Sequence, residues 1–275
     1  MKFNTISVSN FDGALRGMRN PLASWDKSDS VFGLKYYDDL PDYEVAYSWV
    51  EYEYPELDPE GNVFCDKQDL YAEWVRNNGI FKFDEKSEYA EYGFIGPKDM
   101  QLATRLCAGG PEHRKFLRQI QICVDITAPI YWWKEFDTYK VGTTANSTST
   151  MHKLASTPIT LDCFELDDYC AYQLLAFDND QVSMDTDIKD FLNILDTIRQ
   201  KYNETKDKRY WKELVRWLPC GWLQTRTVTM NYENVRTICG QRAGHKLTEW
   251  HQFVDWAHTL PYSSQLIFGE KVALD

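Results

Sequence analysis

Residues 119–130 read QIQICVDITAPI, and this stretch decides the fold. In its first nine residues the even positions are apolar and the odd positions are mostly polar. Apolar residues at every second position are typical of a strand with one buried face. Pro129 follows, and proline suits the first turn of a helix because the N–H that it lacks has no partner there. We therefore expect a half-buried strand that leads directly into a helix over residues 129–140.

A hydroxyl-rich segment, TTANSTSTMH at residues 143–152, follows this helix. Six of the eight residues from Thr143 to Thr150 carry a hydroxyl group, and no proline interrupts them. A linker, a mucin-like tract and a binding segment are the alternatives for such a composition. Because a strand and a helix lead straight into the segment, a linker is disfavoured and we expect a binding loop.

Helical signals occur before the strand and throughout the C-terminal half. Pro97 suits an early helix position and Gly109 suits a stop, which predicts a helix between them. Apolar residues at helical spacing predict four more helices, marked by residues 188–198, 211–218, 231–239 and 247–257. Sheet material early and helices late indicate an α+β fold. We expect one domain over residues 1–275, with an acidic and aromatic insertion around 36–96.

Composition limits the classes of function. The chain of 275 residues is 43% hydrophobic and 15% aromatic, which is enough for a sizeable core. Its formal net charge of −12 argues against general binding of duplex nucleic acid, which needs basic surface. The N-terminus has no apolar run like a signal peptide, and no window of about 18 apolar residues could span a membrane. The seven cysteines contain no C-x-x-C pair, so we expect reduced thiols in a cytoplasmic protein.

Arg242 is a charged residue at a position where the helical pattern favours an apolar one. It lies seven residues after Val235 and four after Ile238, so it shares the apolar stripe of its own predicted helix. An arginine there is costly unless its head is paired or reaches an anion. Two interpretations stay open: snorkelling at the helix end beside Gly244, and contact with an anionic ligand.

The densest basic patch is GGPEHRKFLR at residues 109–118. A phosphate-binding loop and an ordinary basic surface are both compatible with it, because glycine-rich backbone and cations favour anions. The spacings of a Walker motif and of a dinucleotide fingerprint are absent. The chain also has no G-x-S-x-G motif and no H-x-x-x-H pair, so neither a serine nucleophile nor a metal site is indicated.

These pieces, in this order, resemble the flavin-dependent thymidylate synthases. That family has a strand, Ala-Pro-Ile or similar at the start of a helix, Arg-His-Arg-x-x-Ser, and then Asn-Glu-x-Ser-x-Arg-Tyr. Here residues 128–130 match the Ala-Pro-Ile, and 138–140, Thr-Tyr-Lys, take the place of Arg-His-Arg, with Thr143 at the serine. With one extra residue, 146–149, Asn-Ser-Thr-Ser, take the Asn-Glu-x-Ser places, and 151–152, Met-His, take those of Arg-Tyr.

The C-terminal half carries the resemblance independently. The family has an arginine just before a Leu-Pro pair, an asparagine twelve residues past the proline, and an arginine eleven further on. Arg216, Pro219, Asn231 and Arg242 take these places, with the first gap one residue shorter. The stretch LTEWHQF at 247–253 is similar to the family's closing helix. The resemblance covers residues 100–260 in pattern rather than identity.

The resemblance implies a fold in which an antiparallel sheet packs with helices, and a site for deoxyuridylate and FAD between subunits of a homotetramer. The implied substrate-binding residues are Glu135, Ser147, Thr148, Ser149, Thr150, Arg216 and Arg242. The implied cofactor-binding residues are His113, Tyr139, Lys140, Thr143, Asn146 and Asn231. Arg216 would meet the nucleotide phosphate, and Arg242 would act catalytically by stabilising negative charge at the pyrimidine carbonyl.

The implied reaction is the reductive methylation of deoxyuridylate to thymidylate with methylenetetrahydrofolate and reduced nicotinamide (NADPH), without a metal. The altered motif, with Ser147 for its glutamate and Met151 for its arginine, motivates two alternatives. One is an enzyme of the same fold that acts on another pyrimidine nucleotide. The other is a non-catalytic nucleotide-binding protein without flavin. A purely structural protein with an acidic surface is the remaining interpretation.

Overall fold

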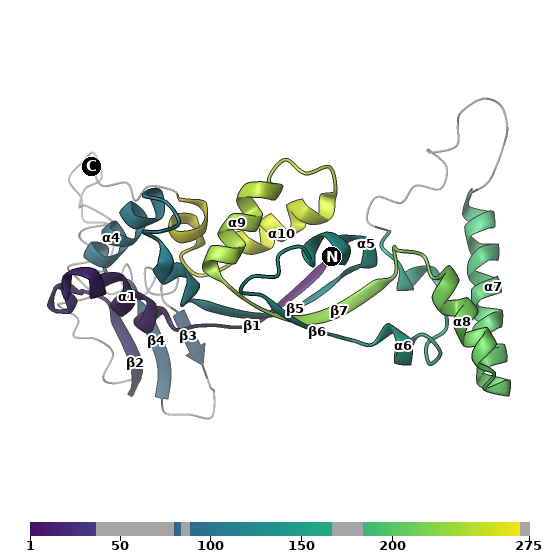
Figure 1. Ribbon diagram of the computed structural model, residues 1–275. Helices are drawn as coiled ribbons and strands as arrows, with labels where there is room; N and C mark the ends of the chain where they lie inside the picture. Colours follow the sequence, from purple (N-terminus) through teal and green to yellow (C-terminus); the bar gives the residue numbers. More distant parts are fainter. Residues whose placement is uncertain (37–79, 84–88, 167–183, 270–275) are drawn as a thin grey trace, which may run out of the picture. The chain divides into compact units, whose positions relative to one another are not determined.

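The computed structural model describes residues 1–36, 80–83, 89–166 and 184–269 (Figure 1). The chain forms two compact units, and each is made of two separate segments. Unit 1 comprises Met1–Ser7 and Cys123–Thr229, and unit 2 comprises Val8–Ile122 and Met230–Asp275. The chain thus passes between the units three times. This division does not test the expectation of one domain over residues 1–275, which stays a prediction.

The centre of unit 1 is a four-stranded sheet with strand order β1-β5-β7-β6 (Figure 1). Its strands are β1 (Lys2–Ser9), β5 (Gln121–Pro129), β6 (Thr144–Ser147) and β7 (Leu223–Asn231). β5 confirms the predicted strand, because Ile122, Val124 and Ile126 are completely buried and alternate with half-buried residues. The strand starts two residues later than predicted and runs two residues further, to Pro129.

Helix α5 (Ile130–Phe136) begins directly after Pro129, as predicted. Its first two N–H groups donate to the carbonyls of Trp222 and Cys220, just before β7, over 3.0 Å each. The helix ends four residues earlier than predicted, because the N–H groups of Thr138 and Tyr139 turn back to carbonyls three residues before them. Gly142, with φ of +79°, lies in the turn that follows.

Unit 1 also contains the helices α6 (Thr150–Lys153), α7 (Met184–Thr205) and α8 (Lys208–Trp217) and the short helical turn η5 (Leu161–Cys163). Helices α7 and α8 lie side by side as a hairpin (Figure 1). They confirm the helices predicted over 188–198 and 211–218. A cluster of buried apolar side chains joins them to the segment after α6, and it consists of Leu154, Ile159, Leu192, Leu195, Leu214 and Trp222. Val215 does not belong to this stripe, because it is 39% exposed.

Unit 2 contains a three-stranded antiparallel sheet with strand order β2-β4-β3. Its strands are β2 (Val31–Tyr36), β3 (Ile80–Phe83) and β4 (Tyr89–Phe94). The register pairs Val31 with Phe94 and Phe83 with Ala90. β2 ends where the insertion predicted around 36–96 begins, and β3 and β4 lie within the C-terminal part of that insertion. Residues 37–79 and 84–88 of that insertion lie outside the described residues.

The longer helices of unit 2 are α1 (Phe11–Arg19), α4 (Pro97–Ala108), α9 (Tyr232–Arg242) and α10 (Thr248–His258). Three short helical turns, η1 (Asn20–Leu22), η2 (Trp25–Lys27) and η4 (Lys115–Arg118), and the π-helix η6 (Ser264–Phe268) connect them. α4 confirms the predicted helix, with Pro97 in its first turn and Gly109 at its C-cap. α9 and α10 confirm the last two predicted helices, and Val235, Ile238 and Cys239 point inward as expected.

A buried ionic cluster ties α1 to α4 within unit 2. Asp99 is completely buried, and its carboxylate accepts a 2.5 Å hydrogen bond from the guanidinium Nε of Arg19. The hydroxyls of Ser28 and Ser30 donate to the other carboxylate oxygen over 2.5 and 2.6 Å. A buried carboxylate is tolerated only when it is paired and hydrogen-bonded, and this one has three donors.

Two further observations concern the described residues. No helix there combines the length and the apolar character that crossing a membrane requires. The five cysteines in the described ranges are all free thiols.

Candidate functional site

The predicted site residues are divided between the two units. His113, Asn231 and Arg242 belong to unit 2, and the other ten, from Glu135 to Arg216, belong to unit 1.

In unit 1 the hydroxyl-rich segment is not the loop that we expected. Residues Thr144–Ser147 form strand β6, which pairs antiparallel with β7 so that Asn146 faces Thr227 and Ser147 faces Arg226. Ser149 then caps α6, and its side chain accepts a hydrogen bond from the backbone N–H of His152. The physical reason is that β7 offers an edge with unpaired N–H and C=O groups, which a threonine-containing segment can extend.

Several hydroxyls of this segment are used to hold its backbone. The Thr148 hydroxyl donates to the carbonyl of Thr225 over 3.1 Å, and the Thr143 hydroxyl donates to the carbonyl of Tyr139. The amide nitrogen of Gln224 donates to the carbonyl of Thr148 over 3.0 Å and lies 3.1 Å from the hydroxyl of Thr150. The segment is therefore an ordered strand and helix start, fixed to β7 at two successive places.

Four other predicted residues of unit 1 have different surroundings. Glu135 and Tyr139 are half-buried around the C-terminal end of α5, and Lys140 is exposed in the turn after it. Arg216 is exposed on α8, where its guanidinium pairs with Glu213 one turn earlier. Among the contacts of the described residues, none joins Arg216 to the hydroxyl-rich segment.

Arg226 is the residue beside this segment that sequence reasoning missed. It lies on β7 opposite Ser147, and its side chain is only 17% exposed. Its guanidinium carbon is 4.3 Å from the ring centre of Trp133, and it donates hydrogen bonds to Asp137 over 2.7 Å and to Gln224 over 3.0 Å. No strand was predicted around Arg226, although the threonines on either side of it favour one. Its neighbours, however, depend on strand pairing that no local pattern reveals.

In unit 2 Arg242 lies half-buried in the last turn of α9, with its guanidinium carbon 4.6 Å from the ring centre of Trp250. A cation over an indole face is attracted by the ring, and a cation at a helix C-terminus is favoured by the helix dipole. These contacts account for the position of Arg242 on an apolar stripe. They keep its charged head at the helix end, which is compatible with both interpretations left open above.

Asn231, the predicted flavin contact, is the N-cap of α9 and is 8% exposed. Its side-chain oxygen accepts a 3.0 Å bond from the N–H of Asn234, whose own side chain accepts from the N–H of Asn231. This capping box begins the helix that carries Arg242. The observed role of Asn231 is therefore to position α9.

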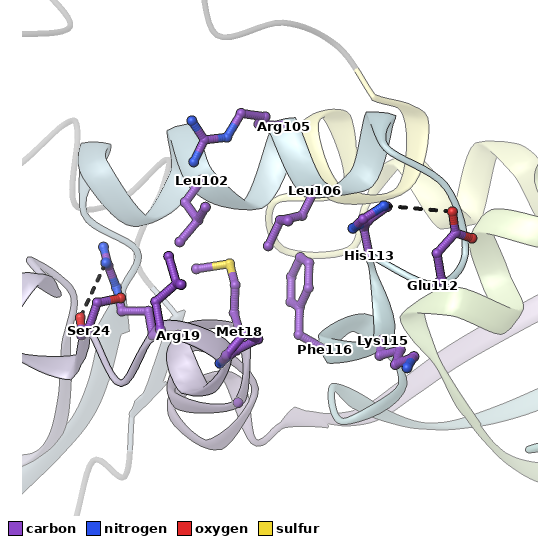
Figure 2. A pocket seen from close by; sticks show the side chains of 13 residues that line it. Met18, Arg19, Ser24, Leu102, Arg105, Leu106, Glu112, His113, Lys115 and Phe116 are labelled. Atoms are coloured by element: carbon purple, nitrogen blue, oxygen red, sulfur yellow. Dashed lines mark hydrogen bonds and ion pairs between the residues drawn. The ribbon is translucent and has the colours of Figure 1, made fainter.

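His113 lines a pocket of about 370 Å³ in unit 2, between α1, α4 and the segment 112–116. Figure 2 shows Leu102 and Leu106 of α4 pointing toward Met18 and Phe116 across it. His113 lies at one end beside Glu112, with 3.7 Å between the imidazole Nε2 and a carboxylate oxygen (Figure 2). Pockets of this size are typical of small-ligand sites.

The basic patch at 109–118 divides into two parts. Arg114 turns away from the pocket and pairs with Glu233 on α9 over 2.8 Å, whereas His113 and Lys115 line the pocket. The backbone N–H groups of His113 and Arg114 both donate to the carbonyl of Gly110, so they close a turn. These two N–H groups are therefore not available to an anion, and the phosphate-loop interpretation stays a prediction.

Burial favours the protonated thiol form of two cysteines in unit 2. Burial raises the pKa of the Cys107 thiol to about 11 and that of the Cys239 thiol to about 12. Both thiols stay protonated at neutral pH, and the thiolate is the reactive form.

No protein-family model matches the sequence, and no curated protein matches it significantly. Solved structures do match the fold. Thymidylate synthase X from Helicobacter pylori, crystallised with FAD and dUMP, has a TM-score of 0.54 at 13% identity, and the match covers 97% of each chain. A second structure of the flavin-dependent thymidylate synthase from Helicobacter pylori, complexed with FAD and dUMP, has a TM-score of 0.53 at 12% identity over 98% of each chain.

A UMP/dUMP methylase, PolB from Streptomyces cacaoi bound with 5-Br UMP, matches at 13% identity with a TM-score of 0.47, over 66% of this chain and 86% of its own. The two matches over almost the whole chain confirm the predicted fold class. The chain therefore has the α+β fold of the flavin-dependent thymidylate synthases, with an antiparallel four-stranded sheet and helices.

Proposed function

We propose that the protein is a thymidylate synthase-like enzyme that methylates deoxyuridylate to thymidylate. It uses FAD, methylenetetrahydrofolate and reduced nicotinamide, and it acts as a cytoplasmic homotetramer. The observation that carries this proposal is the fold likeness to thymidylate synthase X, which extends over 97% of both chains. Motif places in two distant parts of the sequence agree with it, around residues 128–152 and 216–242.

The nucleotide would bind at the hydroxyl-rich segment of unit 1. Ser147 and Asn146 are exposed on an edge strand, and Thr150 begins a helix next to Gln224. Hydroxyl and amide groups of this kind hydrogen-bond sugar and phosphate oxygens. Arg242 would stabilise the negative charge that develops on the pyrimidine during the reaction, which is electrostatic catalysis by a fixed cation.

The residues proposed for FAD fit it in part. The pocket beside His113 has an apolar wall from α1 and α4 and cationic residues in Lys115 and Arg105, which suits a ring system with an anionic tail. Its volume of about 370 Å³ accommodates a portion of a dinucleotide. The other residues proposed for FAD, Tyr139, Lys140, Thr143 and Asn146, belong to unit 1. Bound FAD would supply the reducing equivalents that reductive methylation needs.

An absorbance spectrum of the purified protein, before and after incubation with FAD, tests the cofactor. We expect flavin bands that shift when deoxyuridylate is added. His113→Ala should weaken FAD binding, whereas His251→Ala, which changes an exposed histidine on α10, should not. A colourless protein that does not take up FAD would contradict the flavin part of the proposal. Thymidylate formation with methylenetetrahydrofolate and NADPH tests the reaction.

A second candidate is a nucleotide-binding protein without flavin chemistry. It is favoured by the replacement of the Arg-His-Arg motif by Thr138, Tyr139 and Lys140, which keeps one cation of three. This candidate predicts binding of deoxyuridylate or another pyrimidine nucleotide by a colourless protein, and turnover of any such nucleotide would exclude it.

A further inference from the structure

Arg226 lies beside the hydroxyl-rich segment as a cation whose position is unusually well determined. Three groups from different parts of unit 1 hold its guanidinium: the ring face of Trp133, the carboxylate of Asp137 and the side-chain oxygen of Gln224. Trp133 itself is completely buried, and its indole N–H donates to the carbonyl of Gln224 over 2.9 Å. An arginine fixed in this way loses little further freedom when it binds an anion.

The register of β6 and β7 brings this cation to the segment where the nucleotide is proposed to bind. Ser147 is the partner of Arg226 across the two strands. Side chains of directly opposite residues lie on the same face of a sheet, with their Cβ atoms about 5 Å apart. Gln224, two residues before Arg226 and on the same face, accepts from Arg226 and donates to the carbonyl of Thr148. The side-chain amide of Gln224 therefore connects the guanidinium of Arg226 to the hydroxyl-rich segment.

The guanidinium of Arg226 has more N–H donors than the hydrogen bonds that it makes to the described residues. Of its five N–H groups, one on Nε is used by Gln224 and one on Nη1 by Asp137, and the described residues provide no partner for Nη2. The hydroxyl of Ser147 likewise has no hydrogen-bond partner among the described residues. A group with several acceptor oxygens and negative charge would satisfy both, and a phosphate monoester has this chemistry.

Asp137 is the strongest argument for a purely structural role of Arg226, because it already pairs with the cation. Its carboxylate, however, is 51% exposed and occupies one end of the guanidinium. Because one partner of this ion pair is half in solvent, the pair contributes less stability than a fully buried one. Asp137 can therefore orient the guanidinium while the rest of the fork binds an anion, as in bidentate recognition of phosphate by arginine.

We propose that Arg226, with Ser147 and Thr150 beside it, holds the phosphate of the nucleotide. This inference rests on the proposed function, and it gives to Arg226 the task that the resemblance gives to Arg216. It also supplies a reason why the chain tolerates serine and methionine at the glutamate and arginine places of the family motif, because a cation from β7 reaches the same segment.

Calorimetric titration of the full-length protein with deoxyuridylate and with deoxyuridine, which lacks the phosphate, tests this proposal. The dissociation constant for deoxyuridine divided by that for deoxyuridylate measures how much the phosphate strengthens binding. Arg226→Gln should reduce this ratio by roughly 10- to 100-fold, the effect of a lost charge-assisted hydrogen bond. Arg226→Lys keeps the charge without the fork and should give an intermediate ratio. Asp137→Asn should leave the ratio unchanged or raise it.

The matched control is Arg209→Gln, which removes the same charge from a 90% exposed arginine at the start of α8. It should leave the ratio unchanged, and thermal unfolding of all variants verifies that they are folded. If the wild type binds deoxyuridylate and Arg226→Gln keeps the wild-type ratio, the inference is wrong while the proposed function stands. The same holds if Arg216→Gln alone removes the phosphate contribution. If the wild type does not bind deoxyuridylate, the proposed function fails and the inference fails with it.

Discussion

Arg242 shows how one side chain can satisfy packing and function together. Its guanidinium lies over Trp250 at the end of α9, and the proposed function places it at the pyrimidine. We expect Arg242→Ala to lower the rate of thymidylate formation by about 100- to 1000-fold at saturating deoxyuridylate, because a fixed cation at a developing charge is lost. Stability should fall by only about 0.5–1 kcal/mol, the contribution of a cation–π contact.

The control for this variant is Lys246→Ala, which removes an exposed cation just after α9. Its turnover should equal that of the wild type. A variant Arg242→Ala with normal turnover would mean that the arginine only snorkels at the helix end. Steady-state rates and thermal unfolding of the same preparations separate the two interpretations.

Asp99 illustrates the opposite case, a buried charge whose role is structural. Replacing it with asparagine leaves Arg19, which is 6% exposed, without its carboxylate partner. We expect Asp99→Asn to lower the free energy of unfolding by about 3–5 kcal/mol, because breaking a buried pair leaves an uncompensated charge. Asp12→Asn, at an exposed carboxylate in the first turn of α1, should change it by less than about 0.5 kcal/mol. Urea unfolding measures both, and a small effect of Asp99→Asn would contradict the assigned role.

At the scale of elements, α7 is fastened to the segment after α6 by Asp196. Its carboxylate accepts hydrogen bonds from the guanidinium of Arg199 over 2.6 Å and from the backbone N–H of Ile159 over 2.9 Å. The hydrogen bond from Arg199 is the main reason why the pKa of Asp196 is lowered from 3.8 to about 2. The contact therefore joins a helix to a connecting segment through a group that titrates.

The lowered pKa predicts how the stability of unit 1 depends on pH. Because the folded protein has the lower pKa, the stabilisation is fully present above about pH 4 and is lost as the pH falls toward 2. For a carboxylate that is 20% exposed we expect about 1 kcal/mol after solvent screening. Asp196→Asn should thus be less stable than the wild type at pH 7, and the difference should disappear below about pH 2. Glu204→Gln, in an exposed pair on the same helix, should keep the wild-type profile in denaturation experiments across this range. A constant difference between Asp196→Asn and the wild type at every pH would contradict the assignment.

At the scale of the molecule, three strands run through the boundary between the two units. β1 continues past Ser7, β5 past Ile122 and β7 past Thr229 without a break in the strand. We therefore expect one cooperative thermal transition with equal calorimetric and van't Hoff enthalpies, which also tests the prediction of a single domain.

A pair of variants makes this test sharper. Leu195→Ala removes a side chain from the core of unit 1, where it is 1% exposed, and Asp99→Asn acts in unit 2. Both should move the same transition to lower temperature. Two transitions, each shifted by one variant alone, would show that the units unfold independently.

The features that the sequence determined by itself depend on neighbours close along the chain. The alternation before Pro129, the stop at Gly109 and the helical spacing of Val235, Ile238 and Cys239 are local patterns, and each predicted an element that the structure contains. Their physical basis is local too, because strand periodicity and helix capping involve residues only a few positions apart.

Only the tertiary structure decided which distant segments are in contact. Residues 144–147 have no local signal that separates an edge strand from a loop, and they became a strand because β7 lies beside them. Arg226 likewise has Asp137, 89 residues away, as its partner, and Gln224 reaches Thr148 across 76 residues. A one-residue change of strand register would move Arg226 to the other face of the sheet. The surroundings of the proposed phosphate site are therefore set by strand pairing, which residue patterns along the chain do not encode.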